Sequence, residues 1–436
     1  MSIPKADRSR DAGLAAIPAG TLAVLYPYVY WSTFPMLHDF LDLLVRRGWN
    51  VDLIVPHDSD SDSPVSDLPG VCFRVRDRYL FDSVGVRVPS ALSHHGGRSY
   101  RRLVVHVSRP LARVAWRLLR RARGLLGDQT TYDCVLAIDA EGLGAASRLV
   151  GNAGTPIVYW SLEIDFLDGW SASKHRRAKA REVRLHHRAA LTVSQDPWRA
   201  SALEQENGLR PDPGNVLLVP NAAAGDASQR RTSFAEDYLG IPSTARIVLY
   251  AGHLRDWAQV RQLIGVAAGW PEPYLLVLHS RRRLTDAETR AWQSAIESGG
   301  SADKVVLSGR PLDRVTFECL LRSCHIGLAL YDPCAAGRCN RNVQLMGWSS
   351  GKIADYLQCG LPVIASRLPG IAELLENNDC GVCVTGADDV ARAIRDVDVR
   401  YSEMSRQACE CFDQHLRLDR TAEPLLAALQ DLAREA

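Results

Sequence analysis

A short segment in the last third of the chain combines small residues, a lysine and a carboxylate. It runs from Ser349 to Ser366 and reads SSGKIADYLQCGLPVIAS, so two serines and a glycine precede a helical stretch. Free backbone N–H groups at a helix start, together with the helix dipole, suit an anion. Lys352 falls in the first turn, where a cation is unfavourable unless an anion neutralises it. The segment therefore predicts a phosphate site, and an ordinary helix with an exposed Lys352–Asp355 pair is the alternative.

Carboxylates follow two apolar runs in the first half of the chain. Asp139 and Glu141 come after YDCVLAI, and Glu163 and Asp165 come after TPIVYW. Reacting groups in parallel sheets gather at the carboxyl ends of the strands. Such carboxylates could act as a base or hold acceptor hydroxyls, and Glu163 is the preferred candidate. The alternatives are helix capping by Asp139 and simple solvation of Asp165.

An aromatic run, YPYVYWSTFP, follows the first apolar segment of the chain. It contains Tyr28, Tyr30 and Trp31 but no glycines of the phosphate-binding type. We expect these rings to stack on an acceptor, with core packing as the alternative.

Apolar runs and helical stretches alternate along the whole chain, which predicts parallel sheets with helices on both faces. A helical stretch, HDFLDLLVRRG, is expected to end at Gly48. The expected strands are 21–26, 51–56, 132–139, 155–160 and 189–194, and then 246–252, 274–280, 304–309, 326–331, 361–366 and 381–386.

The two series of strands predict an α/β fold of two tandem, doubly wound, Rossmann-like domains that face a central cleft. The first domain is expected to span 1–218 and to bind the acceptor. A polar linker at 219–235 then leads to a donor-binding domain at 236–403. A helical tail at 404–436 follows, and it could return to the first domain.

Composition limits the function classes. The 436 residues are 46% apolar and 23% charged with a net charge of +2, which fits a globular protein and no nucleic-acid partner. Apolar runs of membrane-spanning length and a signal-peptide pattern are both lacking, so we expect a cytoplasmic protein. The oligomeric state is not indicated.

Eleven cysteines are expected to be reduced thiols. Cys380 and Cys383 form a C-x-x-C pair, and Cys334 and Cys339 flank a loop, but no histidine pair completes a zinc set. We expect no metal and no cofactor.

The stretch 84–127 holds ten arginines and no acidic residue. From residue 111 to 126 it has the apolar spacing of an amphipathic helix. Such a helix could make peripheral contact with an anionic membrane face or bind an anionic acceptor. Packing on its own sheet, with the arginines in solvent, is the alternative.

Four stretches of the chain carry a resemblance in their order. Together they resemble the GT-B glycosyltransferases of family 4, over most of residues 132–400 and most strongly in the second half. The stretches are RRAKAREVRLHHRAALTVSQDPWRASALEQENGL, LLVPNAAAGD, LYAGHLRDWAQVRQLI and GKIADYLQCGLPVIASRLPGIAELLENNDCGVCV.

The resemblance implies residue roles, with departures. Asp355 matches the family acid that binds ribose. The acid eight positions earlier, which binds the donor sugar, falls on Gly347, and Asn340 and Asn342 are candidate replacements. This helix start looks closer to a sub-branch with a Ser-x-Lys pattern.

The donor site is expected to include the start of the second domain. Gly252 and His253 match the family's first loop, and the expected lysine position holds Ala258. The second phosphate-binding cation is assigned to Arg255, with Arg261 as the alternative. The donor-binding set also contains Ser349, Ser350, Gly351, Lys352 and Asp355.

The expected activity is transfer of a sugar from a nucleoside diphosphate sugar to a hydroxyl or amine, with the retention that the resemblance implies. Ser350, Gly351, Lys352 and Arg255 would stabilise the leaving diphosphate without a metal. Asp139, where the family has a histidine, would stabilise positive charge on the sugar carbon.

The acceptor is expected to be a small molecule or lipid-linked, in secondary-metabolite or cell-envelope glycosylation. The alternatives are a sugar-nucleotide epimerase, a non-catalytic sugar-nucleotide-binding partner protein, and an inverting enzyme.

Overall fold

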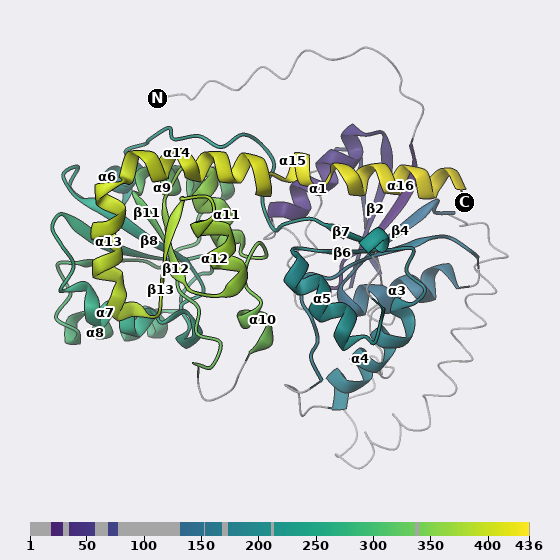
Figure 1. Cartoon of the computed structure of the whole chain (residues 1–436), viewed down its shortest axis with the longest axis horizontal. Helices are drawn as coiled ribbons and strands as arrows, with labels where there is room; N and C mark the ends of the chain where they lie inside the picture. The colour runs from purple at the N-terminus through teal and green to yellow at the C-terminus, as the bar shows by residue number, and fades with distance from the viewer. Residues whose placement is uncertain are drawn as a thin grey trace, which may run out of the picture.

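The computed structural model describes residues 19–28, 35–56, 69–76, 131–151, 153–167, 173–210, 213–335 and 340–435. These residues form two α/β domains, each built on a parallel sheet, with the C-terminal helices running across from one domain to the other (Figure 1). The predicted pair of doubly wound domains is therefore confirmed.

The first sheet is seven-stranded, in the order β3-β2-β1-β4-β5-β6-β7, and its strands pair in parallel. Its strands are β1 (Gly20–Leu25), β2 (Trp49–Pro56), β3 (Val71–Arg76), β4 (Cys134–Ile138), β5 (Ile157–Trp160), β6 (Leu191–Ser194) and β7 (Val216–Leu218). Sequence patterning missed β3 and β7, which lie at the two edges of the sheet. Edge strands bury less apolar surface, and β7 has only three residues.

The second sheet is six-stranded, also parallel, in the order β10-β9-β8-β11-β12-β13. Its strands are β8 (Arg246–Gly252), β9 (Tyr274–Ser280), β10 (Val305–Ser308), β11 (Ile326–Ala329), β12 (Val363–Ser366) and β13 (Gly381–Val384). All six were expected from their apolar runs. Helices cover both faces, so central strands such as β8 and β12 have continuous buried runs.

Helices connect the strands. In the first domain they are α1 (Pro35–Arg46), α3 (Asp139–Val150), α4 (Ser173–His186) and α5 (Pro197–Glu206). In the second they are α6 (Phe234–Leu239), α7 (Val260–Ala267), α8 (Asp286–Ser298), α9 (Arg314–Ser323), α10 (Arg341–Gln344), α11 (Gly351–Gln358), α12 (Pro369–Glu376) and α13 (Val390–Val399). Gly48 adopts φ 84° just after α1, which is the predicted helix stop.

The C-terminal tail returns to the first domain. Helix α14 (Tyr401–Cys411) packs on α11 of the second domain, and a π-helical turn at Phe412–Leu416 leads to α15 (Leu418–Thr421) and α16 (Glu423–Glu435). Leu425, Leu426 and Leu429 are at most 1% exposed and belong to the core of the first sheet. The tail therefore links both cores, and the expected return of the last helix is confirmed.

Polar bonds also join the domains. Asp39 of α1 accepts a bond of 2.7 Å from the Arg314 guanidinium of α9 and another of 2.8 Å from the amide of Ala224 in the linker. Arg341 of α10 lies 3.2 Å from Glu206 of α5. Within the described residues, no helix is long and apolar enough to cross a membrane.

Candidate active site

Lys352 is a buried lysine whose amino group has no hydrogen-bond partner among the described residues. It is the second residue of α11, and its Nζ atom bonds to no group in the described part of the chain. Three aromatic rings surround it instead: the Nζ lies 4.1 Å from the ring centre of Tyr250, 5.0 Å from that of Tyr331 and 5.9 Å from that of Trp257. Ring faces attract a cation, but they do not replace the hydrogen bonds that an ammonium group has in water.

The three rings, here called the aromatic cage, are fixed by their own contacts. Tyr250 donates from its hydroxyl to the His253 carbonyl at 2.7 Å. The Tyr331 ring stacks on Trp257 with centres 5.9 Å apart and planes 3° from parallel. A Cβ atom on Gly252 would lie 3.2 Å from the Lys352 Cε, so the glycine at the end of β8 leaves room for the lysine. The structure therefore brings Gly252, His253 and Lys352 together.

Burial lowers the pKa of Lys352 to about 7, with repulsion from Arg281 as the second cause. Desolvation disfavours the charged form of a lysine, and only a nearby anion restores it. An anion bound beside the Lys352 Nζ would therefore raise this pKa.

The N-terminus of α11 offers further donors. Ser350 caps the helix, because its Oγ accepts from the amide of Ile353 at 3.3 Å, and it also bonds to the Tyr331 hydroxyl at 2.6 Å. The amides of Gly351 and Lys352 are left without an acceptor in the described structure, as is usual for the first positions of a helix. The Ser350 hydroxyl is thus structural, and the free donors are the two amides.

The linker shapes the turn before α11. The backbone amide of Asn221 donates to the Trp348 carbonyl at 2.9 Å, and its side chain donates to the Ser349 carbonyl at 3.2 Å. The Ser349 hydroxyl lies 3.5 Å from the Met346 sulfur. Asn221 therefore holds the turn in place. In the sequence it stands out only as part of the stretch LLVPNAAAGD.

Cations gather around His253. Burial lowers its pKa first, followed by repulsion from Arg255, Arg282, Lys352 and Arg281. Arg255 is exposed at the start of a 3₁₀ turn and forms no ion pair within the described residues. This concentration of positive charge favours an anionic ligand. Arg261, the alternative cation, instead lies over the Trp292 ring of α8 at 4.8 Å, on the helical layer.

Asp355 does not stand alone. Its carboxylate pairs with the Arg281 guanidinium at 3.1 Å. Burial raises the pKa of Asp355, while Arg281 and Arg314 oppose that shift. A ribose that bonds to this carboxylate would have to share it with Arg281, which sequence reasoning did not identify.

Asp139 is a buried anchor. It adopts φ 55°, uncommon for a residue other than glycine, and is 2% exposed. Its Oδ1 accepts from the amides of Leu162 at 2.6 Å and Glu163 at 3.0 Å, and its Oδ2 accepts from the Tyr28 hydroxyl at 2.7 Å. Burial raises the pKa of Asp139 to about 7. Both oxygens of Asp139 are engaged. Its side chain therefore holds the loop that follows β5 and does not cap a helix.

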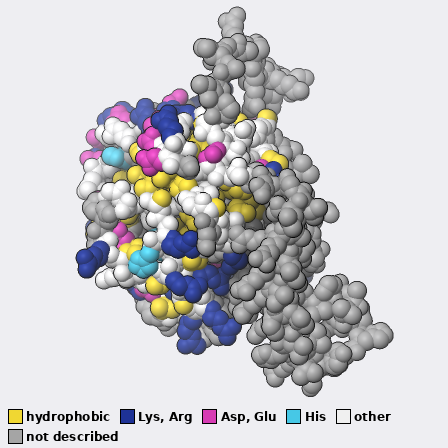
Figure 2. Space-filling view, turned by 90° about the vertical axis from the view of Figure 1, so that its right-hand side faces the viewer, with side chains coloured by type: hydrophobic (Ala, Val, Ile, Leu, Met, Phe, Trp, Pro, Cys, Tyr) yellow, Lys and Arg dark blue, Asp and Glu magenta, His cyan; other side chains and the backbone are white. Residues whose placement is uncertain are grey.

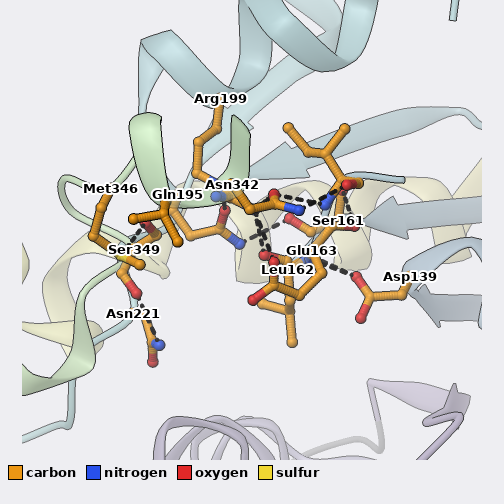
Figure 3. A network of polar contacts seen from close by, with 12 residues as sticks. Asp139, Ser161, Leu162, Glu163, Gln195, Arg199, Asn221, Asn342, Met346 and Ser349 are labelled. Atoms are coloured by element: carbon orange, nitrogen blue, oxygen red, sulfur yellow. Dashed lines mark hydrogen bonds and ion pairs between the residues drawn. The ribbon is translucent and has the colours of Figure 1, made fainter. Parts of the chain in front are cut away.

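The loop Ser161–Ile164, which carries Glu163, is held by side chains from both domains (Figure 3). Gln195 donates to the Ser161 carbonyl at 2.8 Å, and Arg199 donates to the Leu162 carbonyl at 2.7 Å. From the second domain, Asn342 accepts from the Ile164 amide at 3.2 Å and donates to the Ile164 carbonyl at 2.8 Å. Its oxygen also accepts from Arg199 at 3.1 Å, so Asn342 joins the two domains at this loop.

Glu163 is the exposed group of this loop. Its side chain is 69% exposed, and Arg199 lies 3.8 Å from its carboxylate. Desolvation by the surrounding protein raises the pKa of Glu163, and Arg199 partly opposes the shift. The carboxylate is therefore open to a ligand while its backbone is fixed.

Of the other residues expected on the acceptor side, three lie in the described part of the chain and two lie outside it. Tyr28 is 39% exposed and donates to Asp139, Glu141 lies in the first turn of α3, and Asp165 is half-buried. Tyr30 and Trp31 lie outside the described residues, as does the basic stretch 84–127 with its expected helix at 111–126.

The two asparagines proposed to replace the missing acid have other partners. Asn342 binds the loop of the first domain, as described above, and Asn340 caps α10 by accepting from the amide of Val343 at 3.3 Å.

On the outer face of the first domain, Lys and Arg side chains gather below the middle of the view in Figure 2. Exposed arginines of α4 include Arg176, Arg177 and Arg184. Described cysteines are all free thiols, and no cluster of metal-ligating side chains is found among the described residues. Cys339 lies outside them.

No protein-family model matches the chain, and no curated protein matches its sequence. Among solved structures, sucrose-phosphate synthase from Thermosynechococcus elongatus matches with a TM-score of 0.65 at 15% identity, covering 96% of this chain and 100% of the other. The Anabaena protein HepE in complex with UDP matches with a TM-score of 0.65 at 16% identity, covering 94% and 100%. HepE in complex with UDP-glucose gives 0.58 at 15% identity, covering 95% and 98%. The chain therefore has the GT-B fold.

Proposed function

We propose that this protein is a glycosyltransferase that moves a sugar from a nucleoside diphosphate sugar to a hydroxyl or amine acceptor. The observation that carries the proposal is the Lys352 Nζ, buried at the start of α11, which has no hydrogen-bond partner among the described residues; nor do the two amides of that helix start have acceptors among them. Burying an ammonium without an anion costs free energy, so this arrangement is suited to a ligand that supplies negative charge. A diphosphate is such a ligand, because its oxygens can bond to the ammonium and to the helix amides together.

In this proposal the donor domain stabilises the leaving diphosphate. Lys352 and the amide of Gly351 bond to phosphate oxygens, and Arg255 adds charge from the loop after β8. These fixed donors matter most when negative charge develops on the leaving group. They supply the charge that a metal ion supplies elsewhere, so we expect transfer to continue in the presence of EDTA.

The first domain supplies the acceptor side. Glu163 is exposed on a loop whose backbone is fixed, so its carboxylate can hold an acceptor hydroxyl in position. We include retention at the anomeric carbon, as in the family that the sequence resembles, with the diphosphate taking the acceptor proton. Asp139 acts through the loop that it anchors.

The donor base and sugar are proposed only as a starting point. HepE is described in complex with UDP and with UDP-glucose, so UDP-glucose is the first donor to test. The acceptor class remains a small molecule or a lipid-linked molecule, with the protein in the cytoplasm or at the inner membrane face.

The test is a donor screen followed by turnover. Thermal shift with UDP, GDP and ADP and their glucose conjugates identifies the base, and release of nucleoside diphosphate is then followed with and without an acceptor panel. We expect acceptor-dependent release in the wild type and its loss in Lys352→Met. Donor turnover without acceptor would favour an epimerase, binding without any turnover would favour a non-catalytic partner, and NMR of the product decides retention against inversion.

A further inference from the structure

Residue 347, where the resemblance places a sugar-binding acid, has little space for a side chain. A Cβ atom built on Gly347 would lie 3.1 Å from the Gly370 Cα and 3.3 Å from the Asp196 Oδ2. Contacts this short are tighter than most real Cβ contacts. The space beside Gly347 is thus already occupied by a carboxylate, and this carboxylate belongs to the other domain.

Asp196 lies between β6 and α5 and is 1% exposed. Its Oδ1 caps α5 by accepting from the amide of Arg199 at 2.8 Å. Its Oδ2 is buried and has no hydrogen-bond partner in the described part of the chain. Burial raises the pKa of Asp196, and hydrogen bonding by Arg199 opposes that shift. One oxygen is therefore explained by helix capping, and the other is not.

A buried polar atom without a partner is rare in native proteins and needs a reason. Asp196 Oδ2 can only accept hydrogen bonds while the carboxylate is ionised, so the missing partner is a donor. Gly347, which has no side chain, lies beside this oxygen. A ligand that bears hydroxyl groups supplies such donors.

Gly347, the neighbour of the Asp196 carboxylate, lies close along the chain to the proposed phosphate site. Gly347 accepts a backbone bond of 3.0 Å from Ser350, the cap of α11, so it lies in the turn that leads to Lys352. Gly370 lies in the first turn of α12, and Trp198 of α5 bonds to Glu373 of the same helix at 3.0 Å. The sugar of a nucleotide sugar is attached directly to the diphosphate, so it lies beside whatever binds the phosphates.

We propose that Asp196 binds hydroxyl groups of the donor sugar through Oδ2, in place of an acid at residue 347. This inference rests on the proposed function. Because Asp196 comes from the first domain and Gly347 from the second, the sugar is recognised only where the two domains meet. Donor recognition is thereby coupled to domain closure, which excludes water from the reacting carbon.

The test compares Asp196→Asn with the wild type. Asparagine caps helices about as well as aspartate, so α5 keeps its cap, while the amide nitrogen that replaces an oxygen cannot accept a bond. Asp313→Asn is the matched control, because Asp313 caps α9 in the same way by accepting from Thr316 at 3.0 Å. The dissociation constants of UDP and of UDP-glucose are measured for all three proteins by calorimetry, together with the ligand-free Tm.

In Asp196→Asn we expect the ratio of the UDP-glucose to the UDP dissociation constant to rise at least fivefold, with UDP binding changed less than twofold. We also expect its ligand-free Tm to rise, since an unpaired buried charge is removed. Asp313→Asn should leave the ratio unchanged and lower the Tm slightly, since its carboxylate is hydrogen-bonded.

An unchanged ratio in Asp196→Asn, or an equal loss of affinity for UDP and UDP-glucose, would overturn the inference and leave the proposed function standing. If the wild type bound none of UDP, GDP and ADP, alone or as glucose conjugates, the proposed function and this inference would both fail.

Discussion

The two sides of the domain junction treat their buried polar groups in opposite ways. Around the start of α11, the Lys352 Nζ and the Asp196 Oδ2 are buried without a hydrogen-bond partner in the described part of the chain. On the loop side, Asp139 accepts three hydrogen bonds, and Arg199 donates to Gln195, Leu162 and Asn342. In the proposed function, the unpaired groups around α11 are kept for a ligand, whereas the loop-side groups shape the loop. Substitutions on the two sides should therefore change stability in opposite directions.

The largest effect is expected for Asp139→Ala. It leaves the amides of Leu162 and Glu163 and the Tyr28 hydroxyl without their acceptor, which should lower the free energy of unfolding by about 2–4 kcal/mol. Chemical denaturation measures this loss. Asp139→Asn keeps an acceptor for the two amides and should stay within about 1 kcal/mol of the wild type, with most of its activity.

A stable but inactive Asp139→Asn would contradict this comparison. It would return Asp139 to the role that the sequence predicts, as a group that acts directly on the sugar carbon.

The next effect is on turnover and concerns Asn342, the residue of the second domain that reaches the loop. Asn342→Ala removes both bonds to Ile164 and one to Arg199. At about 1 kcal/mol for each of the three net bonds, up to about 3 kcal/mol of loop positioning is lost, so kcat should fall about 10- to 150-fold, while the dissociation constant of UDP stays the same. Steady-state kinetics and calorimetry separate the two quantities.

Asn340→Ala is the control for Asn342→Ala, because Asn340 caps the same short helix, and the hydrogen bond of its side chain to Val343 stays within the second domain. Equal losses of kcat in the two variants would show that α10 itself matters, and not its contact with the loop.

The smallest effect distinguishes two arginines of the donor domain. Arg255 is exposed near His253 and Lys352, so Arg255→Ala should weaken UDP binding about 3- to 10-fold, in the range of one charge-assisted contact. Arg261 lies over Trp292, so Arg261→Ala should change UDP affinity less than about twofold. The reverse order of these two losses would restore Arg261 as the phosphate-binding cation.

Sequence patterning predicted the parts of the molecule that depend on local rules. The buried strands follow from apolar runs, and the start of α11 follows from Ser350, Gly351 and the lysine behind them. Gly252 and Lys352, which lie in contact, were both assigned to the donor-binding set through the family resemblance, and their contact itself was not predicted. The predicted boundaries of the central strands also lie close to the observed ones, because both faces of these strands are buried.

What the sequence did not predict depends on contacts between distant segments. The aromatic cage draws Tyr250, Trp257 and Tyr331 from three separate places, and no spacing rule links them. In the sequence, Arg199 looks like any surface arginine on a helix, although its guanidinium is buried in the folded protein. From the sequence, Asp139 could be interpreted only as a reacting group or a helix cap. Its φ of 55° and its three hydrogen-bond donors arise only in the folded loop, so no local pattern indicates them.

The central claim is that Lys352 binds an anionic ligand. The protonation of the Lys352 amino group on ligand binding tests this claim most directly. Its pKa is lowered to about 7 from 10.5, so at pH 8 most of the ligand-free protein carries a neutral amine. A bound diphosphate favours the ammonium, so binding should draw a proton from the buffer. In the ligand-free protein, Lys352→Met should raise stability most below pH 7, and this gain should vanish as the pH rises toward 10.5.

The measurement is calorimetric titration of UDP into the wild type and Lys352→Met at pH 8, in two buffers of different ionisation enthalpy. The account predicts uptake of close to one proton by the wild type, none by Lys352→Met, and weaker binding by the variant. Equal affinity and equal proton uptake in both proteins would contradict it.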